Sequence, residues 1–278
     1  MSLANKALFV IERSLDEDLS LDEIAARCGV SRFHLAHAFG RSFGLSAIAY
    51  MRGRRLTEAA HALQNGAPNI LHLALDSGYA SHEAFSRAFK AQFGLTPEEA
   101  RQSRPVAGWA EPLARLESKM IALKEPEIRR EGKLLFVGVK ARMAYATIMA
   151  EASGQWRRFM AAAYADIPLK RPGPPIGVTM PIDDERCDYV CAAGVTGFGL
   201  VPPGCEKVIV EPAEYAVFAH DGNVSRLNDT YRPILDEWLP ASGRAMADAP
   251  QLETYNDAFD PRTGDGGIKI WIPLKVAS

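Results

Sequence analysis

A short segment occurs twice near the start of the chain, and it limits what this part can fold into. The segment from Ser31 to Ser46 aligns with the segment from Ser81 to Thr96, 50 residues further on. Each copy begins with a serine, continues with phenylalanines four residues apart and ends at a glycine: Phe39, Phe43 and Gly44, then Phe85, Phe89, Phe93 and Gly94. Serine favours a helix start, a spacing of four places the rings on one face, and glycine favours a helix stop. We therefore predict two similar amphipathic helices.

Another helix precedes each repeated helix. Apolar residues 70–75 and a turn at Gly78 stand before the second copy. A capping box from Ser20 to Glu23 begins a helix that ends near Gly29, before the first copy. Two helices joined by a short glycine-containing turn form a helix-turn-helix unit. We predict one unit at about residues 20–44 and another at about 69–94, with a first helix over 4–15 and a linking helix over 45–63.

The second unit carries a longer signature. It contains Gly78-Tyr79-Ala80-Ser81, then Phe85-Ser86-Arg87-Ala88-Phe89-Lys90, and finally Phe93-Gly94-Leu95-Thr96-Pro97. With the duplication, this order and spacing resembles the AraC family of transcription regulators, over residues 1–104. The resemblance implies an all-α domain with two recognition helices. These would enter the major groove of double-stranded DNA about one helical turn apart.

The resemblance also implies which side chains meet DNA. The base-reading candidates are Arg32, Phe33, Ala36 and His37 in the first unit, and His82, Glu83, Ser86 and Arg87 in the second. Arg87 suits bidentate reading of guanine, and Glu83 can accept a hydrogen bond from a cytosine amino group. The phosphate candidates are Arg41, Arg52, Arg54, Arg55 and Lys90. Two alternatives stay open: Arg87 can pair with a helix neighbour, and the histidines can be ordinary surface residues.

Composition places the chain among globular proteins. It has 278 residues, which suit two domains, with 47% hydrophobic and 24% charged residues. No apolar run reaches the roughly 18 residues that a membrane span needs, and no signal-type segment follows the N-terminus. Four cysteines without a C-x-x-C pair favour a reducing compartment, so we expect the cytoplasm and no membrane partner. The net charge of −2 carries no basic signature.

After residues 105–125, which we predict to be a linker, the pattern changes to alternating strands and helices. The expected strands cover 133–139, 175–180, 188–195, 214–220, 252–255 and 267–274, and the expected helices cover 146–164 and 224–239. The order strand–helix–strand–strand therefore occurs twice. This predicts an α+β domain over residues 126–278, with the helices on one face of the sheet.

This second part resembles the GyrI-like effector-binding domain. The matching segments are residues 212–218, the helix end around Trp238, residues 250–255 and residues 270–274. The resemblance implies a cleft for a small organic molecule, often cationic and aromatic, with aromatic walls and a desolvated carboxylate. Glu253 matches the family's pocket glutamate. The other effector-binding candidates are Tyr255, Tyr145, Trp156, Tyr189, Tyr215, Phe218 and Trp271, and simple core packing is the alternative for each aromatic residue.

Together these features predict a sequence-specific DNA-binding transcription regulator rather than an enzyme, with RNA polymerase as a further candidate partner. One alternative is a hydrolase in which a buried Glu253 and a tyrosine hydroxyl perform acid–base catalysis. Another is a vestigial domain that senses nothing. Cys187, Cys191 and Cys205 match no standard metal spacing, so we expect no metal and no cofactor.

Overall fold

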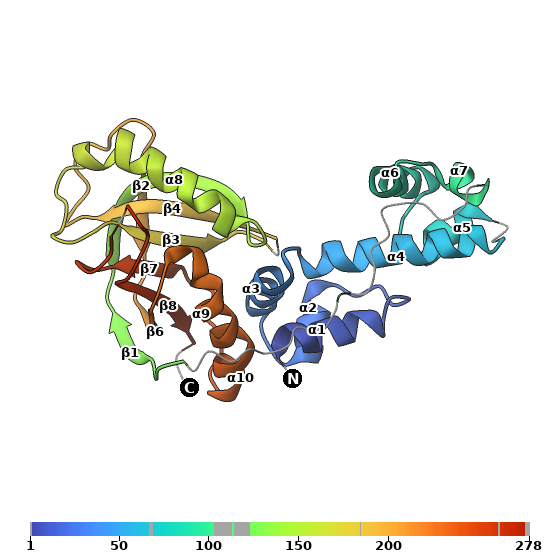
Figure 1. Ribbon diagram of the computed structural model, residues 1–278, viewed down its shortest axis with the longest axis horizontal. Helices are drawn as coiled ribbons and strands as arrows, with labels where there is room; N and C mark the ends of the chain where they lie inside the picture. The colour runs from blue at the N-terminus through green and yellow to red at the C-terminus, as the bar shows by residue number, and fades with distance from the viewer. Residues whose placement is uncertain are drawn as a thin grey trace.

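The computed structural model describes residues 2–66, 69–102, 113, 123–183, 185–260 and 262–275. Its N-terminal part consists of α1 (Leu3–Glu12), α2 (Leu21–Cys28), α3 (Arg32–Phe43), α4 (Ala47–Gln64), α5 (Ile70–Asp76), α6 (His82–Phe93) and α7 (Pro97–Gln102). Figure 1 shows that α4 carries α1 to α3 at one end and α5 to α7 at the other. The predicted helix-turn-helix units are therefore α2–α3 and α5–α6.

The helix ends follow the signals in the sequence. The Ser20 hydroxyl accepts the Glu23 backbone N–H, and the Glu23 carboxylate accepts the Ser20 backbone N–H, which completes the capping box. Ser31, Ser46 and Ser81 cap α3, α4 and α6 with their side chains. Gly44 and Gly94 end α3 and α6 with φ values of 73° and 74°, in the left-handed region that glycine adopts without a Cβ penalty.

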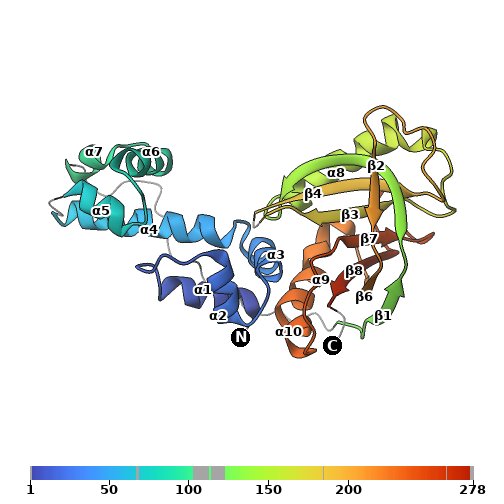
Figure 2. The same ribbon diagram turned by 180° about the vertical axis from the view of Figure 1, so that it is seen from behind.

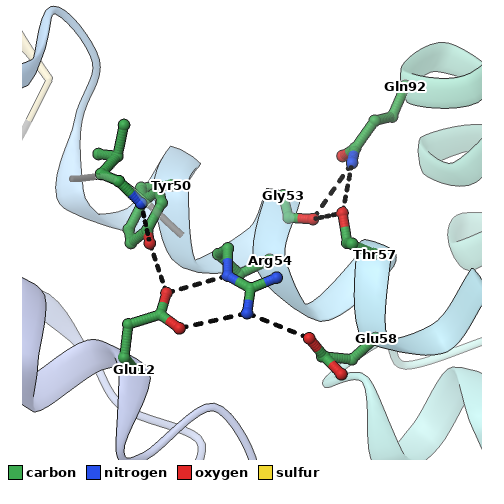
Figure 3. A network of polar contacts seen from close by, with 8 residues as sticks. Glu12, Tyr50, Gly53, Arg54, Thr57, Glu58 and Gln92 are labelled. Carbon is green, nitrogen blue, oxygen red and sulfur yellow. Dashed lines mark hydrogen bonds and ion pairs between the residues drawn. The ribbon is translucent and has the colours of Figure 1, made fainter. Parts of the chain in front are cut away.

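A polar network joins α4 to the helices on both sides of it (Figure 3). Glu12 on α1 accepts hydrogen bonds from the Tyr50 hydroxyl and from Arg54 Nε, the latter at 2.9 Å. Gln92 on α6 donates to the backbone oxygen of Gly53 at 3.1 Å. The Arg54 side chain is only 7% exposed. These contacts fix how α1 and the second helix-turn-helix unit are oriented along α4.

The C-terminal part forms one antiparallel sheet within the described residues. Its strands are β1 (Glu127–Glu131), β2 (Leu134–Ala144), β3 (Ile176–Pro181), β4 (Arg186–Gly194), β5 (Glu206–Val210), β6 (Ala213–His220), β7 (Gln251–Tyr255) and β8 (Ile268–Leu274). The strand order is β1-β6-β8-β7-β3-β4-β2-β5. The two predicted repeats, β2-α8-β3-β4 and β6-α9-β7-β8, meet at the β3–β7 pair. The predicted linker falls mostly outside the described residues.

Strands β1 and β5 were not predicted. Each precedes one repeat in the sequence but pairs with the other repeat, β1 with β6 and β5 with β2. Both lie at the edges of the sheet. This exchange ties the two repeats together at each end.

The helices pack on one face of the sheet, as the pattern predicts. They are α8 (Ile148–Ala162) and a segment made of a 3-10 turn (Val224–Arg226), α9 (Leu227–Pro233), a π-helical stretch (Ile234–Trp238) and α10 (Leu239–Ala241). We expected a single helix over 224–239. Because Pro233 has no backbone N–H to donate, regular α-helical bonding is interrupted there and the helix changes type.

Helix α3 lies against the C-terminal part in both views (Figures 1 and 2). One buried apolar cluster contains Leu35 and Ala36 from α3 together with Tyr145 and Ile234 from the C-terminal part. The two parts of the chain therefore share a core at this contact. No helix in the described ranges is long and apolar enough to cross a membrane.

Candidate DNA-reading helices and effector site

Helix α6 presents its predicted reading face to solvent. Its phenylalanine stripe is buried in a cluster with α4 and α5, which turns the polar face outward. Glu83 and Arg87 are exposed, and Ser86 is half-buried. His82 contacts Glu98 through its Nε2 at 3.2 Å. Hydrogen bonds from its own backbone and from Ser81 lower the pKa of Glu83, so this residue is an acceptor at neutral pH.

Of the five predicted phosphate contacts, Arg41 is buried against the C-terminal part, and the other four divide into two groups. Arg52 and Lys90 are exposed on α4 and α6. Arg54 and Arg55 are 6% and 8% exposed, and both are engaged within the N-terminal part. Arg54 binds Glu12 as described above, and Arg55 Nε donates to the Leu15 carbonyl oxygen at 2.8 Å. These two guanidinium groups are therefore engaged in holding the helices of the N-terminal part together.

Helix α3 presents its predicted reading face to the C-terminal part instead. Ala36 is 3% exposed and His37 is fully buried. The His37 ring lies 3.9 Å from the Tyr145 ring, and Gln251 Nε2 donates to His37 Nδ1 at 3.3 Å. Burial holds the pKa of His37 well below its usual value, so the ring is neutral. In this conformation Ala36 and His37 are not available to DNA.

The first turn of α3 is less covered than its middle. Arg32 and Phe33 are half-buried, and the Arg32 guanidinium lies 5.1 Å from the centre of the Phe33 ring. Arg32 also lies 3.6 Å from the carboxylate of Asp22. An open pocket of about 300 Å³ adjoins these residues and is also lined by Met246, Asp248 and Lys275.

Further polar contacts hold the two parts together. His34 Nε2 donates to the Leu235 carbonyl oxygen at 2.6 Å, and burial lowers the pKa of His34 to about 4. Asp236 accepts the Ala4 backbone N–H at 3.0 Å. Burial raises the pKa of Asp236 to about 6, although the hydrogen bonds from Ala4 and from the Ser42 hydroxyl act to lower it. The Ser46 hydroxyl donates to Glu185 at 2.7 Å.

The predicted effector carboxylate lies on the helix-covered face of the sheet. Glu253 is 5% exposed and accepts hydrogen bonds from two tyrosine hydroxyls, Tyr189 at 3.0 Å and Tyr231 at 2.9 Å. Trp156 Nε1 donates to the Tyr189 hydroxyl at 2.9 Å. Tyr255 stands edge-on to Trp156, with 5.4 Å between ring centroids. The site is thus a closed aromatic cluster around one carboxylate.

Four other aromatic candidates are not brought to Glu253. Tyr215 and Trp271 pack on each other, with 5.8 Å between ring centroids, in the cluster on the opposite face of the sheet. Their side chains point away because neighbouring strand residues alternate between faces. Phe218 lies on the helix-covered side but packs edge-on against Trp238. Tyr145 lies at the contact with α3, as described above.

Two thiols of the C-terminal part, those of Cys187 and Cys191, are shielded from solvent, whereas Cys205 is half-buried. Cys187 and Cys191 are fully buried and free, and burial raises the pKa of Cys187 to about 12. Within the described residues no group of three or more histidines, cysteines and acids is placed to hold a metal ion.

Comparison with known proteins places this geometry in a family. Residues 24–103 match the family described as a helix-turn-helix domain, and residues 124–275 match the GyrI-like small molecule binding domain. The chain belongs to the AraC family. More fully, it is an AraC-type DNA-binding transcription regulator that carries a GyrI-like small-molecule-binding domain.

The similarity to some relatives extends over both parts of this regulator. Transcriptional regulator Rob of Salmonella typhimurium is 27% identical over 273 residues, which cover 95% of this chain and 93% of the relative. Right origin-binding protein of Escherichia coli strain K12 is 28% identical over 286 residues, which cover 97% and 95%. Multiple antibiotic resistance protein MarA of E. coli strain K12 is 36% identical over 93 residues, which cover 34% of this chain and 73% of the relative.

The sequence alone did not single out three residues of the GyrI-like domain, which lie in the cluster around Glu253 or at the contact with α3. Tyr231 supplies the second hydroxyl to Glu253, and Asn228, one helical turn earlier, contacts α3 through Arg41. Gly177 on β3 leaves room for the cluster, since a Cβ there would lie 2.7 Å from the Tyr189 hydroxyl and 3.1 Å from Glu253 Oε2. The i, i+3 spacing of Asn228 and Tyr231 was the one available signal, because it places both on one helix face.

Proposed function

We propose that this regulator reads DNA mainly through α6 and takes up a small aromatic cation at Glu253, without catalysing a reaction. The observation that carries the effector proposal is a buried carboxylate whose hydrogen-bond donors among the described residues are two neutral hydroxyl groups, those of Tyr189 and Tyr231. Removing an ion from water without supplying a countercharge costs roughly several kcal/mol of desolvation free energy. Such a group supplies the countercharge when a cation enters.

The aromatic residues around Glu253 support an aromatic rather than a metal cation. Trp156 and Tyr255 offer ring faces and edges next to the carboxylate, and aromatic faces attract organic cations. An effector would enter by displacing part of this closed cluster. We propose Glu253, Tyr189, Tyr231, Trp156 and Tyr255 as the effector site.

For DNA, exposure supports α6. Arg87 carries no hydrogen bond or ion pair within the described chain and is exposed, so it is free to donate two hydrogen bonds to guanine. Arg52 and Lys90 are the proposed phosphate contacts. We also propose that the regulator acts in the cytoplasm and contacts RNA polymerase when bound at a promoter.

The hydrolase alternative has weaker support from the chemistry of the cluster. Burial and the Glu253 charge raise the pKa of Tyr189 and of Tyr231 well above the usual value, so neither hydroxyl readily gives up its proton near neutral pH. Burial likewise raises the pKa of the nearby Cys191 thiol. General acid–base catalysis is most efficient when the pKa of the group lies near the working pH.

Selection of bound sequences from random duplexes tests the DNA proposal. Wild type, Arg87→Ala and Lys90→Ala are compared across a salt series. We expect wild type to enrich a motif and Arg87→Ala to lose preference at one position, by about 1–3 kcal/mol. Lys90→Ala should keep the motif and lose affinity evenly, with a salt slope smaller by about one. If Arg87→Ala keeps the wild-type base preference at every position, base reading by Arg87 is contradicted.

A further inference from the structure

We propose that Arg41 acts as an internal cation for the effector-binding domain, and that this contact holds α3 away from DNA. A cationic effector that replaces the Arg41 guanidinium would release α3. The inference rests on the proposed cation site at Glu253 and adds the means by which that site controls DNA binding: the first recognition helix itself competes with the effector.

Arg41 leaves α3 and stacks on α9. Its Cζ lies 3.6 Å from the centre of the Tyr231 ring, and its Nη1 donates to Asn228 Oδ1 at 2.9 Å. The residue is 6% exposed, and its Nε and Nη2 are buried without a hydrogen-bond partner in the described part of the chain. A planar cation lying on an aromatic face with few hydrogen bonds is held as an aromatic pocket holds a cationic ligand.

Tyr231 links this cation to the proposed effector site. One face of its ring carries Arg41, and its hydroxyl donates to Glu253 at 2.9 Å. Burial and the Glu253 charge raise the pKa of Tyr231, whereas the Arg41 charge lowers it, so both charges act on the same ring. A cation drawn to Glu253 and to the Tyr231 face would therefore compete with Arg41 for one place.

The contact around Arg41 is incompletely hydrogen-bonded. Besides the two Arg41 nitrogens, buried atoms without a partner among the described residues include His37 Nε2, Tyr145 Oη and Gln251 Oε1. His37 touches both Tyr145 and Gln251, so these atoms lie where α3 meets the C-terminal part. Separation of the two surfaces would let water satisfy them, which offsets part of the cost of opening. The contact can therefore hold α3 and still be reversed.

Opening would change what α3 can offer DNA. In the closed form, by which we mean the observed packing of α3 on the C-terminal part, Ala36 and His37 are buried, whereas Arg87 on α6 is exposed. Release would uncover the first reading face and free the Arg41 guanidinium for a phosphate. By linkage, an effector that prefers the open form strengthens DNA binding, and DNA strengthens effector binding by the same factor.

Asn228 allows a test without altering a residue that would meet DNA or the effector carboxylate. Asn228→Asp places a carboxylate at the 2.9 Å contact with Arg41 Nη1 and should tighten the closed form. Asn228→Ala removes this hydrogen bond and should loosen it. Ser225→Asp, on the exposed turn before α9, adds the same charge as Asn228→Asp and serves as the control. Full-length protein is titrated with a duplex from the selection above, with and without tetraphenylphosphonium, a permanently charged aromatic cation.

A second readout follows the contact itself. Ala36→Cys, in a Cys205→Ser background that removes the half-buried thiol, reports opening through its rate of alkylation by a maleimide. We expect Asn228→Asp to be alkylated at least about fivefold more slowly than wild type and to bind DNA at least about fivefold more weakly, because an ion pair replaces the hydrogen bond from the Arg41 guanidinium to a neutral amide oxygen. Asn228→Ala should change both in the opposite direction, and Ser225→Asp should match wild type. Tetraphenylphosphonium should speed alkylation of wild type.

Each outcome decides one part of the proposal. Equal alkylation rates in wild type, Asn228→Asp and Asn228→Ala would overturn the role of Arg41 as a latch, whatever the DNA and effector results. If the rates follow Asn228 but tetraphenylphosphonium neither binds nor alters them, the latch stands, release by a cation is refuted, and the proposed effector class fails with it. If the cation binds and Glu253→Gln abolishes its binding, yet alkylation of wild type is unchanged by it, the effector site stands and competition with Arg41 is refuted.

Discussion

Replacing Glu253 with glutamine should separate stability from ligand binding in the GyrI-like domain. Glutamine has the shape of glutamate, so the two tyrosine contacts at 3.0 and 2.9 Å can be kept with reoriented hydroxyl groups. What changes is the charge. In the described chain this carboxylate receives hydroxyl donors and no salt bridge, so its charge is not required by a visible ionic partner.

The expected stability change is the difference between two terms. Hydrogen bonds to charged groups contribute about 1.5–3 kcal/mol and neutral ones about 1 kcal/mol, so Glu253→Gln loses roughly 2 kcal/mol over two bonds. Against this, the variant avoids the desolvation of a buried ion, which is roughly several kcal/mol. We expect unchanged stability or a gain of about 1–2 kcal/mol, since removing an unpaired buried charge relieves a strain kept for function.

The same substitution should weaken cation binding strongly. Two unit charges about 4 Å apart interact by about 4 kcal/mol at an effective dielectric constant near 20, and this corresponds to roughly a thousandfold in affinity. Glu211→Gln removes an exposed carboxylate from the same domain and is the matched control, because its side chain is 70% exposed. We expect that control to bind tetraphenylphosphonium as wild type does.

Tryptophan fluorescence can follow this domain within the full chain. All four tryptophans (Trp109, Trp156, Trp238 and Trp271) lie after the N-terminal helices. Urea unfolding monitored by fluorescence gives the stability term, and calorimetric titration with tetraphenylphosphonium gives the binding term. A loss of more than about 2 kcal/mol in Glu253→Gln would mean that the carboxylate is structural, because it would exceed the hydrogen-bond term. Undiminished ligand binding would refute its role as countercharge.

Three further substitutions probe other contacts. Gly177→Ala should weaken tetraphenylphosphonium binding about tenfold and lower the free energy of unfolding by about 1–3 kcal/mol, because its Cβ would lie 2.7 Å from the hydroxyl of the buried Tyr189; Gly154→Ala, whose Cβ meets no described atom within 4 Å, is the control in calorimetry. Glu12→Gln should lower the free energy of unfolding, followed by circular dichroism, by about 2 kcal/mol, because the Arg54 side chain, which is 7% exposed, loses its main partner. Glu58→Gln changes a side chain that is 53% exposed and should lower it by less than about 0.5 kcal/mol. Asp236→Asn should make the melting temperature fall more steeply than in wild type as pH is lowered from 6.5 to about 4. In wild type the raised pKa of Asp236 stabilises the contact at low pH, and this stabilisation is lost as pH rises through about 6. The lowered pKa of His34 has the opposite effect, which would remain in the variant. A parallel pH profile would contradict the last prediction.

The local fold was predictable because its signals are local. Ser20 and Glu23 make the capping box that their spacing predicts, and the glycine stops fall at the ends of α3 and α6. Strand β1 was missed because Glu127-Ile128-Arg129-Arg130-Glu131 is charged and lies at a sheet edge, so it lacks the apolar alternation of a buried strand. Its partner β6 begins more than 80 residues later, which no local pattern reveals.

A residue of the candidate sites could be predicted from the sequence only where its own side-chain chemistry and a local motif point to it. Glu253 was predicted from its motif, but Tyr231 was not, because its hydroxyl reaches Glu253 only through the packing of α9 on the sheet. The burial of His37 was also beyond the sequence. Small and weakly polar residues such as Ala36 and Gly40 suit close contact with DNA and close contact with a domain equally well; a Cβ on Gly40 would lie 3.3 Å from Tyr145 Cβ.

A switch built on this contact needs a closed form that is only moderately favoured. To move a conformational equilibrium from 99:1 to 1:99, a ligand must prefer one form by about 5.5 kcal/mol. The attraction of Glu253 for a cation supplies about 4 kcal/mol, on the estimate for two charges about 4 Å apart, so it suffices only if closure itself is weak. Buried groups left without partners cost about 1–3 kcal/mol each, and five atoms of Arg41, His37, Tyr145 and Gln251 are buried without a partner among the described residues. Their incomplete bonding therefore brings the closed form within the range that one small cation can overcome, whereas a fully satisfied contact would hold α3 beyond its reach.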